Sequence, residues 1–139
     1  MTKVTIVLRS DMPEIERLAA EVSRFADAHG IAPEAAGDLN LALEEVVANV
    51  ITHAYPQGGV HDIRVEITAA KDRLTAQVED EGVYFDPLRR ADPDITLPIE
   101  KRSVGGLGLF FVRKVMDELS YSREAGRNRL TMAKRVTRI

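Results

Sequence analysis

The segment from Pro33 to Ala54 constrains the fold more than any other part of the chain. Apolar residues recur along it at helical spacing, which predicts a helix with a broad apolar stripe. The run Tyr55–Gly59 ends this helix, because proline and glycine do not continue a helix cheaply. The apolar stripe consists of Leu39, Leu43, Val46, Val50 and Ile51, widened by Leu41, Val47 and Ala48. Such a helix requires a broad apolar surface from the rest of the chain.

Alternating apolar and polar residues predict the strands that supply this surface. A short strand is expected at Val4–Leu8. Residues 63–68 and 74–79 alternate on either side of a turn, which predicts an antiparallel hairpin with one apolar face. Residues 121–124 and 130–136 flank a second turn, at 126–128, and predict a closing hairpin.

Two further helical patterns complete the chain, one at Ile15–Ala26 and one after Gly108. The expected order is therefore strand, two helices, hairpin, loop, helix and hairpin. This order predicts an α+β fold, a two-layer sandwich with three helices on a mainly antiparallel mixed sheet. The length of 139 residues fits one ordinary domain, so we expect a single domain over residues 1–139.

Composition excludes several classes of protein. The net charge is −3, with 19 Lys and Arg against 22 Asp and Glu, which argues against a nucleic-acid partner. The absence of cysteine excludes disulfides, thiolate zinc sites and a cysteine nucleophile. No apolar signal core opens the sequence, and no apolar run approaches the length of about 18 residues that marks a membrane helix. We therefore expect a soluble, cytoplasmic protein without a membrane partner.

The long helix carries a row of polar residues. Glu45, Asn49 and His53 are spaced at i, i+4 and i+8, so they share one face of the helix. A carboxylate in such a row can act as a general base, and an amide oxygen is a hard ligand that suits Mg²⁺. The alternative is an ordinary solvated helix face.

A second motif, Asp80-Glu81-Gly82, follows the first hairpin directly. An acidic side chain at the end of a strand can accept a hydrogen bond from an amino group of a ligand. The glycine allows the backbone to approach a flat ligand closely. The alternative is simple turn chemistry, in which Asp-x-Gly is common.

Regular patterns stop between residues 83 and 104, where three prolines interrupt the chain. A segment of this length without regular structure is usually a functional lid or is disordered. We expect a lid over about 83–104.

Gly105–Gly108 follows this segment and opens the third helix. Glycines at this place expose backbone N–H groups at the positive end of a helix, which favours phosphate binding. The motif is not a Walker A sequence, because no Gly-Lys-Ser/Thr follows, and it lacks the preceding parallel strand of the dinucleotide fingerprint. A flexible hinge is the alternative.

Taken in this order, the motifs resemble those of the GHKL ATPase family, whose fold is also called the Bergerat fold. The local sequences are most similar to the anti-sigma-factor serine kinases of the RsbW and SpoIIAB type. The resemblance covers nearly the whole chain. It departs from the family at Tyr84, whose ring we expect to narrow the nucleotide pocket or to pack against the lid. The matching segments are Leu41–Asn49 with His53–Tyr55 (the N box), Asp80–Pro87 (the first glycine box), Gly105–Val112 with Met116 and Asp117 (the second), and Gly126–Thr131.

The resemblance implies roles for the three polar residues of the long helix. Glu45 matches the general base that takes the proton from the attacking serine hydroxyl. Asn49 matches the Mg²⁺ ligand that bridges the triphosphate. His53 lies near the phosphate end by its spacing, so we count it among the cofactor-binding residues.

The resemblance also implies roles outside this helix. Asp80 matches the residue that binds the adenine amino group, and Thr131 matches a hydroxyl on the last strand that supports it. Gly82 is expected to permit close approach of the base. Gly106 and Gly108 are expected to line the phosphates beneath the lid.

The function that follows from the resemblance is an ATP-dependent serine protein kinase that acts as an anti-sigma, partner-switching regulator. Its expected cofactors are ATP and Mg²⁺. Its expected substrate is an anti-sigma-factor antagonist of the STAS type, and its second partner a sigma factor or a similar target. A homodimer is compatible with the family, with the first strand and helix as the candidate surface. The alternative is a non-catalytic nucleotide-binding module of the same fold that acts through protein contacts.

Overall fold

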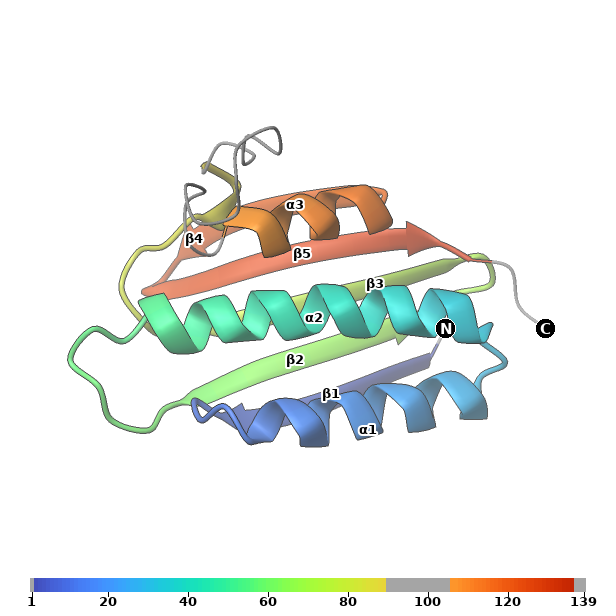
Figure 1. Ribbon diagram of the computed structural model, residues 1–139, viewed down its shortest axis with the longest axis horizontal. Helices are drawn as coiled ribbons and strands as arrows, with labels where there is room; N and C mark the ends of the chain where they lie inside the picture. The colour runs from blue at the N-terminus through green and yellow to red at the C-terminus, as the bar shows by residue number, and fades with distance from the viewer. Residues whose placement is uncertain (1, 90–105, 137–139) are drawn as a thin grey trace.

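The computed structural model describes residues 2–89 and 106–136, in which three helices lie on one face of a five-stranded sheet (Figure 1). This is the α+β two-layer sandwich that the sequence predicts, in the predicted order of elements. None of the helices in these ranges combines the length and the apolar character that crossing a membrane requires. The elements are β1 (Thr2–Arg9), α1 (Glu14–Ala28), α2 (Pro33–His53), β2 (Asp62–Ala69), β3 (Arg73–Asp80), the short 3₁₀ helix η1 (Pro87–Arg89), α3 (Gly106–Val115), β4 (Glu118–Glu124) and β5 (Arg127–Arg135).

The sheet has the strand order β1-β2-β3-β5-β4, and every neighbouring pair is antiparallel. The expectation of a mixed sheet is therefore wrong for the described strands. The crossover through α3 does connect two strands of the same direction, β3 and β4. However, β5 lies between them and pairs with both, so the two parallel strands are not neighbours.

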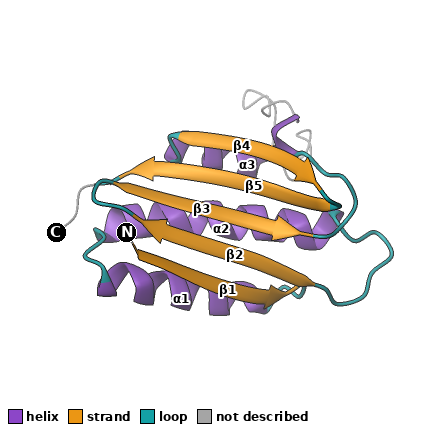
Figure 2. Cartoon of the chain, turned by 180° about the vertical axis from the view of Figure 1, so that it is seen from behind, coloured by secondary structure: helices purple, strands orange, loops and turns teal. Residues whose placement is uncertain are grey.

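The two faces of the sheet have different surroundings, because the helices cover one face and leave the other open (Figure 2). In β2, Ile63, Val65 and Ile67 are fully buried, while Arg64 between them is exposed. This alternation follows from the pleat of a strand, which sends successive side chains to opposite faces. The strands therefore carry an apolar inner face toward the helices and a polar outer face.

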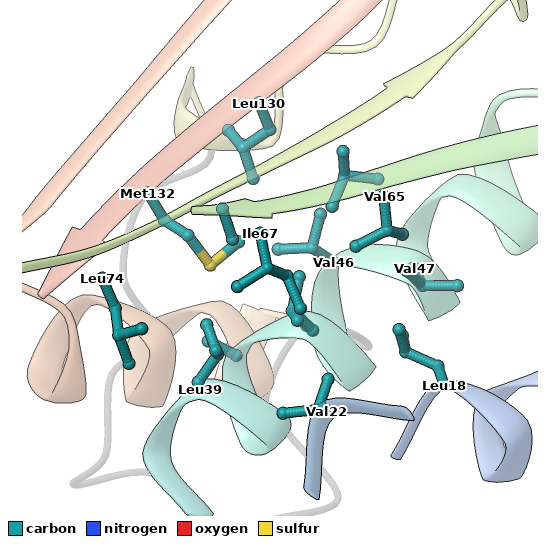
Figure 3. Packing of buried hydrophobic residues seen from close by; sticks show 14 of the residues in the cluster. Leu18, Val22, Leu39, Val46, Val47, Val65, Ile67, Leu74, Leu130 and Met132 are labelled. Carbon is teal, nitrogen blue, oxygen red and sulfur yellow. The ribbon is translucent and has the colours of Figure 1, made fainter. Parts of the chain in front are cut away.

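Helix α2 is the centre of the helical layer and lies between α1 and α3 (Figure 1). Its apolar stripe faces the inner side of the sheet, as the sequence predicts, with Leu39, Leu43 and Val46 buried. The expectation that Leu41 widens the stripe is wrong: it is 41% exposed, because it lies on the same outer side of α2 as the exposed Glu44. Figure 3 shows Leu39, Val46 and Val47 of α2 near Val65 and Ile67 of β2. Burial of this stripe on the sheet fixes the rotation of α2, and with it the direction of the polar row Glu45, Asn49 and His53.

Candidate functional site

The polar row on α2 is largely withdrawn from solvent. Asn49 is 9% exposed, and Glu45 and His53 are partly buried. Burial raises the pKa of Glu45 above its usual value, and the negative charge of Glu44 adds to this effect. A carboxyl group with a raised pKa is a stronger proton acceptor than an ordinary glutamate, which suits a general base.

The side-chain amide of Asn49 has no hydrogen-bond partner among the described residues. Buried polar side chains in folded proteins are nearly always hydrogen-bonded, and an unpaired one costs about 1–3 kcal/mol. The amide of Asn49 is therefore available to bind a group that lies outside the described part of the chain, such as a ligand.

Asp80 lies at the end of β3 and is 4% exposed. Its Oδ1 accepts hydrogen bonds from the backbone N–H of Gly82 at 2.8 Å and from the Nδ2 of Asn128 at 2.9 Å. Within residues 2–89 and 106–136, no hydrogen bond reaches Oδ2. Burial raises the pKa of Asp80, against the opposing effects of these two hydrogen bonds and of Arg123. The carboxyl group therefore has one satisfied and one unsatisfied oxygen.

A single small cavity brings Asn49 and Asp80 together between α2 and the sheet. Its other walls include Val46, Val78, Phe85 and Asn128. The cavity volume is about 20 Å³, room for one water molecule and not for a purine ring. The structure thus places the two residues at one small cavity, while their expected roles in binding a nucleotide stay predictions.

Phe85 and Pro87, from the segment that follows β3, line the cavity as well. The ring of Phe85 stacks on the imidazole of His53, with ring centroids 5.0 Å apart. His53 therefore contacts a residue of the cavity wall, and its expected place near phosphate remains a prediction. The backbone N–H of Phe85 also donates to Asn128 Oδ1 at 3.3 Å.

Tyr84 does not narrow this cavity. Its side chain is 52% exposed, and its ring packs edge-on against Tyr121 with centroids 5.7 Å apart. The neighbouring aromatic residue, Phe85, lines the cavity instead. The expected contact between Tyr84 and the rest of the lid falls partly outside the described residues.

Gly82 is required by the end of α2 in this structure. A Cβ atom at position 82 would lie 2.3 Å from the carbonyl oxygen of Ala54 and 2.6 Å from its Cβ. The next backbone N–H, of Val83, donates to the same carbonyl oxygen at 2.8 Å. The close approach of a nucleotide base to Gly82 stays a prediction. The close approach of Gly82 itself to the end of α2 is a feature of the fold.

Thr131 is not brought to Asp80. The β3–β5 register pairs Thr131 with Gln77, and Asp80 with Asn128. Because Thr131 is three residues from Asn128 on the same strand, its side chain points to the opposite, outer face of the sheet. The supporting residue of Asp80 is Asn128, and the expectation for Thr131 needs this correction.

Sequence reasoning missed Asn128 because it assigned residues 126–128 to a turn. The strand in fact begins at Arg127, so Asn128 is its second residue. A tight turn in which Ala125 and Gly126 take positive φ connects β4 to β5. The signal available in the sequence was the alternation of Asn128, Leu130 and Met132, all of which are buried.

The glycine-rich motif begins α3, as predicted, with Gly106 as the first residue of the helix and Gly108 in its first turn. Of the lid expected over 83–104, residues 90–104 lie outside the described residues, as does Gly105. The described beginning of that segment contains η1. Its Leu88 carbonyl accepts a hydrogen bond from Arg113 of α3 at 2.9 Å. The contribution of Gly106 and Gly108 to phosphate binding stays a prediction.

These features define a class of protein. The model of the histidine kinase-like ATPase domain family matches residues 8–134, and the chain belongs to this family. Its fold and the order of its motifs are those expected of a GHKL-type ATPase domain.

Among curated proteins, the chain is similar to serine-protein kinases. It is 29% identical over 128 residues to the serine-protein kinase RsbW of Listeria monocytogenes, covering 89% of this chain and 82% of that protein. It is 32% identical over 105 residues to RsbW of Bacillus cereus, covering 73% and 65%. It is 29% identical over 94 residues to the serine/threonine-protein kinase BtrW of Bordetella bronchiseptica, covering 68% and 66%.

Solved structures support the fold. The RsbU and RsbW domains of Rv1364c from Mycobacterium tuberculosis match with a TM-score of 0.70 and 19% identity, over the whole of this chain and 34% of that chain. The histidine kinase domain of the blue-light activated histidine kinase from Erythrobacter litoralis matches with a TM-score of 0.57 and 18% identity, over 88% and 59%. At these identities the likeness concerns the fold alone.

Proposed function

We propose that this protein binds Mg-ATP and transfers a phosphoryl group to a serine of a partner protein. The observation that carries the proposal is a pair of buried groups in one cavity, the Asn49 amide and Asp80 Oδ2, that find no hydrogen-bond partner in residues 2–89 and 106–136. Relatives named as serine-protein kinases support the same activity.

The donor and acceptor set of the cavity fits a nucleotide. Asp80 Oδ2 is a buried acceptor that suits the exocyclic amino group of adenine, which donates hydrogen bonds. The apolar walls, Val46 and Val78 among them, suit the faces of a purine ring. Because the cavity holds only about one water, the segment that carries Phe85 and Pro87 must move outward when a base enters.

Metal and phosphate would lie on the α2 side of the site. The amide oxygen of Asn49 would hold Mg²⁺, which keeps water and phosphate oxygens in its other positions. Bound Mg²⁺ would neutralise charge on the phosphates of ATP during transfer. Gly106 and Gly108 would offer N–H groups of the first turn of α3 to these phosphates, beneath a lid over about 83–104.

Glu45 would act as the general base. It lies one turn before Asn49 on the same side of α2, and its raised pKa favours proton uptake. The serine oxygen would attack the γ-phosphorus, the bond to the ADP oxygen would break, and the serine proton would pass to a carboxylate oxygen of Glu45. Phosphoserine and ADP are the products.

The partner side of the proposal follows the family. The substrate would be a STAS-type anti-sigma-factor antagonist, and the alternative partner a sigma factor or a similar target. Phosphorylation adds nearly two negative charges to the antagonist, which would disrupt its contact with the kinase and release the kinase for the other partner. We further propose a single cytoplasmic domain over residues 1–139 that forms a homodimer through β1 and α1.

The experiment that tests this function is a calorimetric titration with Mg-ATP, followed by radiolabel transfer to candidate STAS proteins. We expect binding, and transfer to one serine of one candidate. Glu45→Gln should keep nucleotide affinity and lose transfer. Nucleotide binding without phosphoryl transfer to any of the candidate STAS proteins would favour a non-catalytic nucleotide-binding module. Absence of binding at millimolar Mg-ATP would refute the proposal.

A further inference from the structure

Asn128 has more hydrogen-bond partners than any other side chain at the cavity. It is 4% exposed and lies opposite Asp80 in the β3–β5 register. Its Nδ2 donates to Asp80 Oδ1 at 2.9 Å and to the carbonyl oxygen of Val83 at 2.8 Å. Both amide hydrogens are thereby used.

The amide oxygen of Asn128 is used as fully as its nitrogen. Oδ1 accepts from the backbone N–H of Phe85 at 3.3 Å, from Arg123 Nη1 at 3.1 Å and from the hydroxyl of Tyr121. Three donors that converge on one oxygen fix the orientation of the amide, because a flipped amide would place its N–H groups against them. The nitrogen must therefore face Asp80.

This arrangement determines how Asp80 presents itself to the cavity. With Gly82 N–H and Asn128 Nδ2 both on Oδ1, the carboxylate cannot rotate without breaking two hydrogen bonds. Oδ2 is thus left as the acceptor for a ligand. Arg123 reinforces the arrangement, since the same Nη1 donates to the carbonyl oxygen of Gly82 at 2.8 Å.

We infer that Asn128 is a positioning residue that sets the base selectivity of the site, by holding Asp80 with one oxygen reserved for an exocyclic amino group. The inference rests on the proposed nucleotide function and deepens it. A site built around a buried acceptor rejects a base that presents a carbonyl oxygen at the same place, because two acceptors then face each other without a proton.

Other side chains at position 128 cannot reproduce this arrangement. A serine hydroxyl has one proton and cannot donate to both Asp80 and Val83. Aspartate would place a second carboxylate beside Asp80, and two carboxylates in contact cannot both stay ionised. One of them would then carry a proton, which could be donated to a carbonyl oxygen of the base.

The test compares Mg-ATP with Mg-inosine triphosphate, in which a carbonyl oxygen replaces the exocyclic amino group. Dissociation constants are measured by calorimetry for the unmodified protein, Asn128→Asp, Asn128→Ser and a matched control, Ser122→Ala. Ser122 is an exposed residue of β4 between Tyr121 and Arg123 in sequence, so its side chain points away from both. Thermal melting confirms that each variant is folded.

The readout is the ratio of the two affinities, which a merely structural role of Asn128 would not change. We expect the unmodified protein and Ser122→Ala to prefer ATP by about tenfold or more. Asn128→Ser should bring the ratio close to one, and Asn128→Asp should shift it toward inosine triphosphate.

Three outcomes would overturn the inference. If folded Asn128→Ser and Asn128→Asp keep the unmodified ratio, Asn128 does not set selectivity, although the proposed nucleotide function stands. If the unmodified protein binds both nucleotides equally, the site lacks the selectivity that we assign to it. If it binds neither, the proposed function fails, and this inference fails with it. Should Asn128→Asp not fold, the ratio for Asn128→Ser decides.

Discussion

Polar side chains are buried and hydrogen-bonded on the inner face of the sheet, and largely exposed in ion pairs on its outer face. On the inner face, Asp80 and Asn128 are almost fully buried, and each hydrogen bond has a fixed direction. On the outer face, Glu79 pairs with Arg127 and Arg129, whose side chains remain about half exposed. Exposed ion pairs of this kind contribute about 0–1 kcal/mol, whereas a buried polar group left unpaired costs about 1–3 kcal/mol. The few buried polar groups therefore define the site, and the many exposed ones do not.

The largest effect is expected at Gly82. Gly82→Val should destabilise the protein by more than 3 kcal/mol, roughly the upper range of single substitutions, because its Cβ would overlap the carbonyl oxygen of Ala54. Urea unfolding measures this loss. Gly37→Ala, within α2, is the control, since a Cβ there meets no atom within 4 Å beyond the neighbouring backbone of the helix, and it should stabilise by about 0.5–1 kcal/mol. If Gly82→Val were as stable as the unmodified protein, the end of α2 would have to move away from residue 82 at little cost in free energy.

The second effect, at Asn49, separates stability from function. Asn49→Leu should abolish Mg-dependent ATP binding, since the proposed metal ligand is lost. It should also stabilise the unliganded protein by about 1 kcal/mol, because it removes a buried amide without a described partner.

The matched variant is Asn128→Leu, which removes an amide whose hydrogen bonds are all made. It should destabilise by about 2–4 kcal/mol, since the buried Asp80 loses one of its two hydrogen bonds and the carbonyl of Val83 loses the Asn128 donor. Calorimetry measures the ATP affinity of the two variants, and urea unfolding measures their stability. If Asn49→Leu destabilised the chain as much as Asn128→Leu, the amide of Asn49 would have a structural partner.

A smaller effect concerns the pH dependence of phosphoryl transfer. Burial and Glu44 both raise the pKa of Glu45, so the acid limb of the transfer rate should lie above the usual glutamate value. Glu44→Gln removes the like charge, lowers the pKa of Glu45 and should shift this limb to lower pH. Rate profiles of the two proteins from pH 4 to 8 measure the shift. A limb that moved upward, or stayed in place, would remove Glu45 as the titrating base.

The smallest effects are expected on the outer face. Thr131→Val should leave stability and ATP affinity within about 0.5 kcal/mol of the unmodified protein, because the side chain points away from the cavity. Arg129→Gln should cost little stability, and less at high salt. If Thr131→Val lowered ATP affinity more than tenfold, Thr131 would support the adenine-binding residue as the sequence predicts. The functional difference between the inner and outer faces of the sheet would then not hold.

Periodicity made the fold predictable. The apolar stripe of α2 and the alternation in β2 and β3 depend on local sequence, so the elements, their order and the two layers follow from it. The polar row and Asp80 were also predictable, because regular elements with fixed spacing carry them. The structure places Asn49 and Asp80 in one cavity, as their predicted roles require.

The rest of the site depends on features that local sequence does not determine. Whether Thr131 or Asn128 meets Asp80 is a matter of register, and an odd displacement along a strand reverses the face of a side chain. The place of Phe85 in the cavity wall, stacked on His53, depends on a contact between distant segments, for which spacing gives no signal. The steric demand at Gly82 comes from Ala54, the residue that follows α2, and β2 and β3 separate the two in the sequence.

The contact between Gly82 and Ala54 also limits how this chain can vary over generations. Any single-base change in a glycine codon that replaces the residue introduces a side chain, and even alanine brings the Cβ atom that the carbonyl of Ala54 excludes. Shortening residue 54 offers no escape, because the obstructing oxygen belongs to the backbone. A different residue at position 82 therefore becomes accessible only in a lineage where the end of α2 has already moved.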